Sequence, residues 1–214
     1  MTEAALILGA VFFSAAFFSA CALARPSNAR QASGMEPLTL TVRPARIADA
    51  ADIGRIYRES WLDTYPGVIP AALLTAMTVR GQTARWRAAI AARGREAVFI
   101  AEDEKNGIVG MTSFGPSRDG SLGLDGEVYT LYVDPAHYGC GAGRALLTNG
   151  FAALKQRGYK SCIIWAHARN PARFFYERMG GRLVAERTIR MLGDAVPEAG
   201  FGWKHLAVAE KSSA

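Results

Sequence analysis

Residues 127–144 read Glu-Val-Tyr-Thr-Leu-Tyr-Val-Asp-Pro-Ala-His-Tyr-Gly-Cys-Gly-Ala-Gly-Arg, and they are the most informative part of the chain. A β-prone run over 128–133 ends at Asp134-Pro135, and a turn with alternating glycines follows, at Gly139, Gly141 and Gly143. Residues 144–155 then carry apolar side chains at helical spacing, namely Leu147, Phe151 and Leu154. The sequence therefore predicts a strand, a glycine-rich loop and a helix in immediate succession.

This order of elements favours the binding of a phosphate group. The start of a helix presents backbone N–H groups without intrahelical partners and the positive end of the helix dipole, and glycines let the backbone approach an anion closely. The dinucleotide pattern G-x-G-x-x-G fails because Arg144 stands where its third glycine belongs, and no Gly-Lys pair follows Gly139 at P-loop spacing. Spacing alone leaves open a glycine-rich turn without a ligand.

The stretch resembles motif A of the GCN5-related N-acetyltransferases (GNAT family), with Tyr138 in the position that the family usually fills with Gln or Arg. A second segment, Asn170 to Gly181, resembles the family's Asn-x-x-x-x-Phe-Tyr-x-x-x-Gly segment. The resemblance covers roughly residues 40–206 and places a strand at 161–167 and a hairpin at 98–114. It implies an α/β (α+β) fold with a mixed, mostly antiparallel twisted sheet and helices on both faces.

The segments outside these motifs also carry structural signals. The spacing of Ile53, Ile56, Tyr57 and Trp61 predicts an amphipathic helix from Asp49 to about residue 64. Residues 183–191 and 201–208 are expected to close the chain as a final pair of strands.

The resemblance implies acetyl-CoA as co-substrate and no metal. The loop would hold the pyrophosphate, and the strand before it would pair with the pantetheine arm through its main chain. The residues that this assigns to coenzyme binding are Leu131, Tyr132, Val133, Tyr138, Gly139, Cys140, Gly141, Ala142, Gly143, Arg144, Asn170 and Ala172. From sequence alone, Leu131 to Val133 also suit ordinary β core, and Asn170 also suits a helix cap.

Two residues are candidates for proton transfer. By resemblance, Tyr176 is the general acid that protonates the leaving thiolate; packing against Phe175 is the alternative. Glu127 is the candidate general base, and a period of two along the strand places it on one face with Tyr129, Leu131 and Val133. Apolar surroundings there would raise its pKa toward what a base needs. The alternative for Glu127 is a solvated acid at the strand end.

The expected acceptor is a primary amine of a small molecule or peptide. The resemblance directs attention to Trp61, Tyr65 and Phe114 as walls of the acceptor cleft, although buried packing is the alternative for these aromatic side chains. The Trp-x-x-Thr-Tyr-x-Gly pattern at 61–67 also resembles a bacterial subgroup that includes polyamine-type acetyltransferases. The competing function is a non-catalytic acyl-CoA-binding or sensor module.

The N-terminal residues allow several interpretations. Residues 4–24 carry no charge and are long enough to span a bilayer; a secretory signal, or a start at Met35, are the alternatives. We expect an apolar segment and linker over 1–34, the acetyltransferase domain over 38–208 and a tail over 209–214. The expected location is the cytoplasm, or the cytoplasmic face of the inner membrane if residues 4–24 form an anchor.

Charge and cysteine content restrict the partners. The formal net charge is +6, and no Lys/Arg run suggests nucleic acid. A homodimer remains open. The three cysteines do not form a disulfide framework; Cys162 is expected in the core, and Cys140 is expected to be an incidental thiol, although nearby amides offer a way to lower its pKa. The three histidines show no metal-ligand spacing.

Overall fold

The computed structural model describes residues 39–69, 71–92, 94–191 and 194–207. The apolar segment and linker expected over 1–34 and the tail over 209–214 lie outside the described residues. Within the part of the chain that is described, no helix combines the length and the apolar character needed to cross a membrane.

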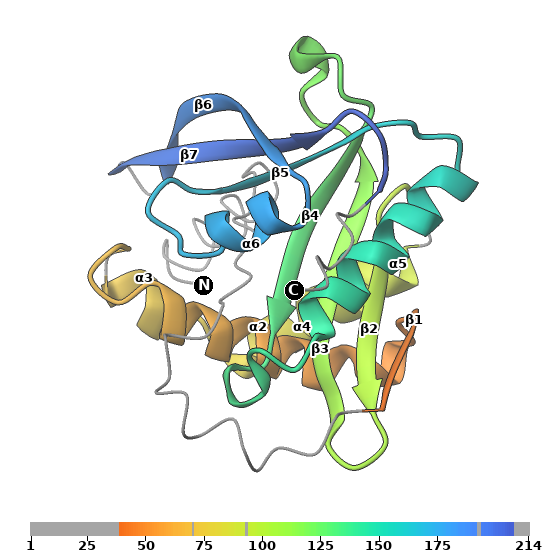
Figure 1. The fold of residues 1–214 in the computed structure, drawn as a ribbon. Helices are drawn as coiled ribbons and strands as arrows, with labels where there is room; N and C mark the ends of the chain where they lie inside the picture. Colours follow the sequence, from red (N-terminus) through yellow and green to blue (C-terminus); the bar gives the residue numbers. More distant parts are fainter. Residues whose placement is uncertain (1–38, 70, 93, 192–193, 208–214) are drawn as a thin grey trace, which may run out of the picture.

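One sheet of seven strands organises the molecule, in the order β1-β2-β3-β4-β5-β7-β6 (Figure 1). Every neighbouring pair is antiparallel except β4 and β5, which are parallel. The predicted mixed, mostly antiparallel twisted sheet is therefore confirmed. The strands are β1 (Leu40–Pro44), β2 (Ala97–Asp103), β3 (Gly107–Pro116), β4 (Gly126–Val133), β5 (Cys162–His167), β6 (Arg182–Met191) and β7 (Asp194–Trp203).

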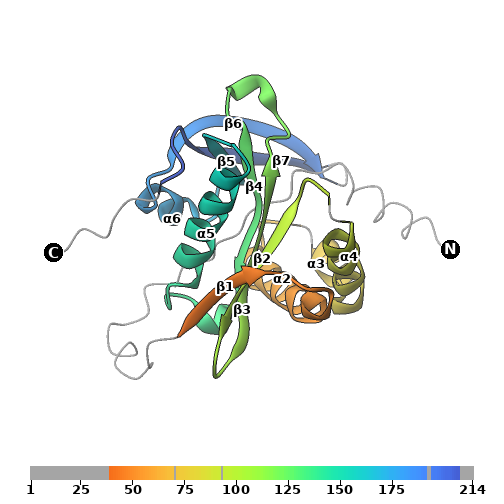
Figure 2. The same cartoon turned by 90° about the vertical axis from the view of Figure 1, so that its right-hand side faces the viewer.

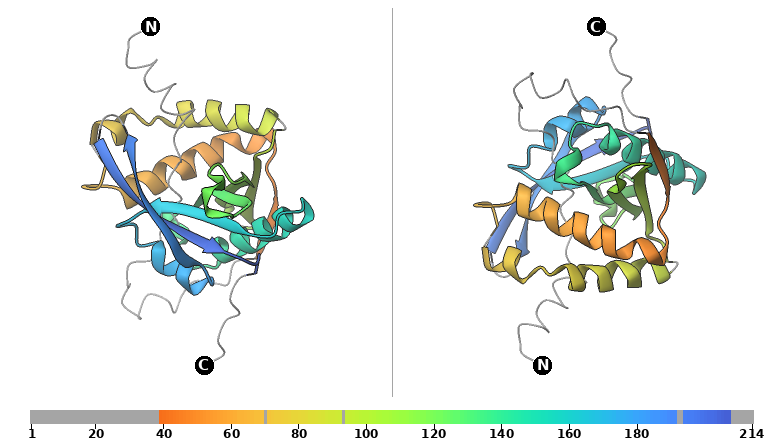
Figure 3. Two further views of the ribbon diagram at one scale, coloured as in Figure 1. Left: turned by 90° about the horizontal axis from the view of Figure 1, so that it is seen from above. Right: turned by 90° about the horizontal axis from the view of Figure 1, so that it is seen from below.

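Helices cover both faces of this sheet, as predicted (Figure 2). One face, which we call the α5 face, packs against α5 (Ala142–Gln156) and α6 (Arg173–Arg178). The opposite face, the α2 face, packs against α2 (Ala50–Thr64) and α4 (Val79–Ala91), with α3 (Ala71–Ala76) nearby. Figure 3 shows α2 and α4 lying side by side. Each face has its own apolar core, so the sheet separates two layers of helices.

The sequence explains most of these boundaries. The predicted face of α2 is confirmed, because Ile53, Ile56, Tyr57 and Trp61 are all buried. The last strand differs from the expectation, since β7 begins at Asp194 rather than near residue 201. Proline and glycine weaken the strand signal within 194–203, and pairing with β5 and β6 nevertheless holds this segment in the sheet.

A β-bulge divides β4 into two parts. Pairing with β3 passes from Ser113–Thr130 to Phe114–Val128, so Tyr129 is the extra residue. Pairing with β5 is confined to residues 126–128 of β4 and 162–164 of β5. Among the described residues, β4 has no ladder partner on the β5 side from Tyr129 to Val133. The sheet therefore opens in its middle, immediately before the glycine-rich loop.

Candidate functional site

The glycine-rich loop leads directly into α5. Gly139 and Gly141 have φ angles of 81° and 93°, a left-handed conformation that favours glycine, and Gly141 is the N-cap residue of α5. Both glycines are exposed, and a Cβ added at either would meet nothing within 4 Å. Conformation and open space, rather than crowding, therefore explain these glycines.

The N-terminal amides of α5 suit an anion. The first helical hydrogen bond joins the Ala145 amide to the Gly141 carbonyl at 3.0 Å, so the amides of residues 142–144 precede the first regular donor of α5. The positive end of a 15-residue helix lies at the same place. These residues fit a pyrophosphate group, which the open space beside the two glycines can accommodate.

A network at the end of β4 fixes the entry to this loop. The Asp134 carboxylate accepts hydrogen bonds from the Ala136 amide (3.0 Å) and from Arg55 on α2 (2.7 Å). Burial alone would raise the pKa of Asp134, but the bonds from Arg55 and Ala136 outweigh it and hold that pKa below its usual range. The Ser60 hydroxyl also donates to the Val133 carbonyl at 3.0 Å. Arg55 and Ser60 escaped the sequence analysis because nothing in their spacing links α2 to β4.

The strand residues assigned to the pantetheine arm have buried side chains. Leu131 and Val133 join the core under α5, whereas Tyr132 joins the core under α2 and accepts a hydrogen bond from the Trp61 indole at 2.8 Å. The β-core interpretation is confirmed. Pairing with the pantetheine arm would use only the main chain, and the main chain of residues 131–133 has no ladder partner on β5 among the described residues. The assignment of these residues to the pantetheine arm stays a prediction.

The prediction that Glu127 shares a face with Leu131 and Val133 is wrong. The bulge at Tyr129 adds one residue, and an added residue reverses the alternation of side chains. Glu127 therefore lies on the α2 face of the sheet. The solvated interpretation is also wrong, because Glu127 is 1% exposed and is held by Arg118.

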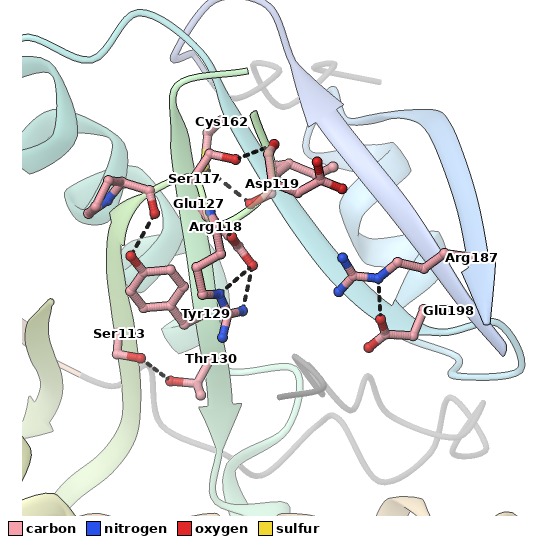
Figure 4. A network of polar contacts seen from close by, with 12 residues as sticks. Ser113, Ser117, Arg118, Asp119, Glu127, Tyr129, Thr130, Cys162, Arg187 and Glu198 are labelled. Carbon is pink, nitrogen blue, oxygen red and sulfur yellow. Dashed lines mark hydrogen bonds and ion pairs between the residues drawn. The ribbon is translucent and has the colours of Figure 1, made fainter. Parts of the chain in front are cut away.

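Arg118 engages both oxygens of Glu127. Its backbone amide donates to Oε2 at 2.9 Å, and its Nε donates to Oε1 at 3.1 Å, with Nη2 as a further donor to Oε1. The guanidinium also stacks over the Tyr129 ring at 4.5 Å (Figure 4). The role of Glu127 as base stays a prediction, and a base in this position would have to act while bound to an arginine.

Tyr176 is a residue of α6, and its side chain is buried in the core between α6 and the sheet. Its ring contacts Phe175 (5.5 Å between centroids), Phe201 (5.6 Å) and Trp203 (6.4 Å). The packing alternative is therefore confirmed as a description of the ring. The acid role concerns the hydroxyl, which this packing does not involve, and it stays a prediction.

Asn170 organises the turn between β5 and α6. Its side-chain oxygen accepts from the Ala172 amide at 2.8 Å, and its amide nitrogen donates to the Tyr65 hydroxyl at 3.1 Å. Asn170 thus orders this turn, but the helix-cap alternative is wrong, because the N-cap residue of α6 is Ala172. Contact with pantetheine stays a prediction. Burial raises the pKa of Tyr65 well above its ordinary value, so this phenol is neutral at physiological pH.

The aromatic residues named for the acceptor cleft are all buried. Trp61 and Tyr65 contact each other in the core under α2, with 5.0 Å between ring centroids. Phe114 is 0% exposed and packs against Phe99 beneath α5, on the face opposite to Glu127. We leave Phe114 out of the acceptor site for this reason.

Sequence reasoning missed a polar cluster on β5, β6 and β7. Arg187 Nε donates to Glu198 Oε2 at 2.7 Å (Figure 4). The Arg187 guanidinium lies 3.7 Å from the Trp165 ring centroid. Burial raises the pKa of Glu198. His167 faces Glu198 in the strand register, and burial and Arg169 lower its pKa. Alternation along β7 would have revealed Glu198 if that strand had been predicted to begin at Asp194.

Neither Cys140 nor Cys162 has a lowered thiol pKa. Cys162 is buried in the core, as predicted, and burial raises its pKa. Burial also raises the pKa of the Cys140 thiol, which outweighs the lowering by the Ala142 amide, so the low-pKa alternative for Cys140 is wrong. The described residues contain no group of three or more His, Cys, Asp or Glu side chains arranged to hold a metal ion.

The sequence and the fold both match known acetyltransferases. Residues 94–180 match the family model of the acetyltransferase (GNAT) domain. Over 168 residues the chain is 36% identical to the uncharacterized N-acetyltransferase YuaI of Bacillus subtilis, a match that covers 78% of this chain and 95% of that protein. It is also 34% identical over 90 residues to the mycothiol acetyltransferase of Saccharomonospora viridis, covering 40% of this chain and 29% of that protein.

Solved structures share the fold at lower identity. The PaiA N-acetyltransferase of Thermoplasma acidophilum, in complex with coenzyme A, gives a TM-score of 0.58 at 17% identity and covers 76% of this chain and 98% of that chain. A phosphinothricin acetyltransferase of Sinorhizobium meliloti, in complex with acetyl-CoA, gives 0.58 at 23% identity and covers 83% and 92%. Together with the near full-length match to YuaI, these findings show that the chain belongs to the GCN5-related N-acetyltransferase family and is an N-acetyltransferase.

Proposed function

We propose that this enzyme transfers the acetyl group of acetyl-CoA to a primary amine of a small molecule or peptide. The observation that carries the proposal is the coincidence of two features. The amides at the start of α5 suit a pyrophosphate, and β4 loses its β5 partner over the residues that lead into the same loop. A coenzyme bound at the loop can therefore extend its arm along an open strand edge.

The α5 face supplies the coenzyme contacts in this proposal. The amides of residues 139–144 hold the pyrophosphate, and charge-assisted N–H bonds of this kind contribute about 1.5–3 kcal/mol each. The main chain of residues 131–133 pairs with the arm, and Asn170 and Ala172 border it at the β5–α6 turn. One N–H of β4 polarises the thioester carbonyl as an oxyanion donor.

The reaction also needs a proton acceptor and a proton donor. A carboxylate on the α2 face takes a proton from the acceptor ammonium, so that the nitrogen lone pair can attack the thioester carbon. Tyr176 protonates the thiolate as the carbon–sulfur bond breaks; a phenol with a pKa near 10 can do so without being ionised at rest.

We also propose that residues 38–208 form one acetyltransferase domain and that the reaction takes place in the cytoplasm. The support is that both motifs and both helix layers fall within this range. An anchor at residues 4–24 would place the same domain on the cytoplasmic face of the inner membrane, and the deletion described in the Discussion addresses this alternative.

An acceptor screen tests the proposed function. The purified chain is mixed with acetyl-CoA and a panel of amines, amino acids, polyamines and peptides, and release of free thiol and the mass of the products are followed. We expect amine-dependent thiol release and a product heavier by one acetyl group. Calorimetric binding of coenzyme A without turnover on any amine would instead indicate an acyl-CoA-binding module.

A further inference from the structure

Three buried polar groups without hydrogen-bond partners gather on the α2 face, at the β5–β7–β6 end of the sheet. They are Arg187 Nη2, Glu198 Oε1 and Trp165 Nε1, and none has a partner among the described residues. Their side chains contact one another through the Arg187–Glu198 ion pair and the stacking of Arg187 on Trp165. Because buried polar groups are almost always paired, such a concentration indicates a place that a ligand completes.

The cluster lies beside the Glu127–Arg118 pair. Figure 4 shows the Arg187 guanidinium pointing from β6 toward Arg118 and Glu127 on the β4 side. Arg118 and Glu127 are also close enough to act electrostatically on the Glu198 carboxyl. The strand register places Glu127, Trp165, Arg187 and Glu198 on the α2 face, whereas the glycine-rich loop and α6 flank the α5 face. A molecule that meets the thioester from the side opposite the coenzyme therefore encounters these two carboxylates.

The two carboxylates differ in what they can still accept. Both oxygens of Glu127 receive hydrogen bonds from Arg118. In Glu198, Oε2 receives the Arg187 bond and Oε1 receives none, although the side chain is 0% exposed. A buried carboxylate oxygen without a donor is costly, and an ammonium group is the donor that best offsets this cost. The Arg187 side chain is 26% exposed, so the cluster reaches the protein surface at this residue.

We propose that Glu198 binds the acceptor ammonium through Oε1 and is the base that takes its proton. This inference rests on the proposed function. It assigns Glu127 to the wall of the acceptor site, where Arg118 fixes it, and makes Glu198 a catalytic residue. Arg187 is a positioning residue, because it holds Oε2 and leaves Oε1 directed at the amine.

The proton balance of the step is complete. Glu198 takes one proton from R–NH₃⁺, the nitrogen attacks the thioester carbon, and the C–S bond breaks as Tyr176 protonates the thiolate. The second proton that the nitrogen must lose restores the Tyr176 phenol, and Glu198 passes its proton to water. One ammonium and one thioester thus yield one amide, one thiol and one proton.

The charges around Glu198 set the pH dependence. Burial raises its pKa, Arg187 and Arg118 lower it, and Glu127 raises it again. His167 faces it from β5 in the register, and Tyr65, the C-cap residue of α2, is close enough for Glu198 to raise the pKa of Tyr65. A base must be ionised to act, so kcat/KM should rise with pH through the raised pKa of Glu198, above the ordinary glutamate range near 4.3.

The test compares three isosteric variants. Glu198→Gln should lower kcat/KM for the acceptor by about 10²–10⁴ and remove the acidic limb of the pH profile, with the Kd of coenzyme A unchanged. Glu127→Gln should cost less than Glu198→Gln and keep the limb. Glu186→Gln, exposed on β6 and paired with Ala199 next to Glu198, is the matched control and should behave as wild type.

The outcomes separate this inference from the proposed function. A wild-type rate and pH profile in Glu198→Gln would overturn the role of Glu198 and leave acetyl transfer intact. A wild-type enzyme that acetylates no amine would overturn both. If Glu198→Gln fails to fold by circular dichroism, Glu198→Asp replaces it: an unshifted acidic limb in that variant, or no acidic limb in the wild type, would contradict the assignment.

Discussion

At the scale of single residues, the conformation of Gly141 should control coenzyme affinity. Gly141→Val must adopt φ near 93° or distort the loop, and a non-glycine residue in such a conformation costs about 1–3 kcal/mol. Distortion moves the amides that are proposed to hold the pyrophosphate. We expect the Kd of coenzyme A, measured by calorimetry, to rise by at least about tenfold.

Gly158 provides a control for this variant. It has φ of 91° and open space around it, as Gly141 has, but it follows the far end of α5. Gly158→Val should therefore lose similar stability in thermal unfolding and keep its coenzyme affinity. Equal loss of affinity in both variants would show a general effect of destabilisation and would argue against the loop as the pyrophosphate site.

Tyr176 should affect turnover more than binding. In Tyr176→Phe the ring keeps its contacts with Phe201 and Trp203, so the melting temperature should change little. Loss of a general acid typically lowers kcat by about 10²–10⁴. Steady-state kinetics and calorimetry measure the two effects separately, and a loss confined to coenzyme affinity would remove the acid role.

At the scale of elements, the contact between α2 and the end of β4 should stabilise the loop in a pH-dependent way. The folded-state pKa of Asp134 is lowered, so its contribution is present above the unfolded pKa near 3.9 and is lost as pH falls through the folded pKa. Asp134→Asn should destabilise the protein at pH 7. Because Arg55 is 36% exposed, screening limits the loss to about 1 kcal/mol.

Urea unfolding of the wild type and Asp134→Asn at several pH values measures this difference. The two unfolding free energies should converge as pH falls from about 4 through the lowered folded-state pKa of Asp134, since the wild-type carboxyl then becomes protonated as well. If the difference in unfolding free energy stayed constant over that pH range, the Asn side chain would be disturbing the packing, and loss of the ion pair would not be the cause. Asp63→Asn, at an exposed position near the end of α2, serves as the comparison.

An element could be predicted from the sequence where residues adjacent in the chain determine it, and could not where pairing with a distant strand determines it. The loop and α5 follow from adjacent residues, so the glycine positions and the helix from Ala142 could be predicted closely. The face of Glu127 could not, because the bulge at Tyr129 arises from pairing with β3 and counting along one strand misses it. The Arg187–Glu198 pair was missed because it depends on the register of β6 with β7.

At the scale of the whole molecule, the sheet separates the proposed coenzyme site from the proposed acceptor site. The glycine-rich loop and α6 lie beside the α5 face, whereas the strand register places Glu127, Arg187 and Glu198 on the α2 face. The gap between β4 and β5 is where the two sides meet. This arrangement lets a thioester and an amine approach the same strand edge from opposite sides, which is the geometry that direct transfer requires.

The residues of both proposed sites lie within residues 39–207, and this predicts the result of removing residues 1–34. The shortened chain, which begins at Met35, should fold and bind coenzyme A with a Kd within about twofold of the full chain, because both cores and both proposed sites are retained. Calorimetry measures the coenzyme affinity of both proteins. Sedimentation with anionic lipid vesicles measures whether each protein binds a membrane. Co-sedimentation of the full chain alone would support the anchor at residues 4–24. A large loss of coenzyme affinity on deletion would instead show that the N-terminal residues contribute to the site, and the domain boundary at residue 38 would then be wrong.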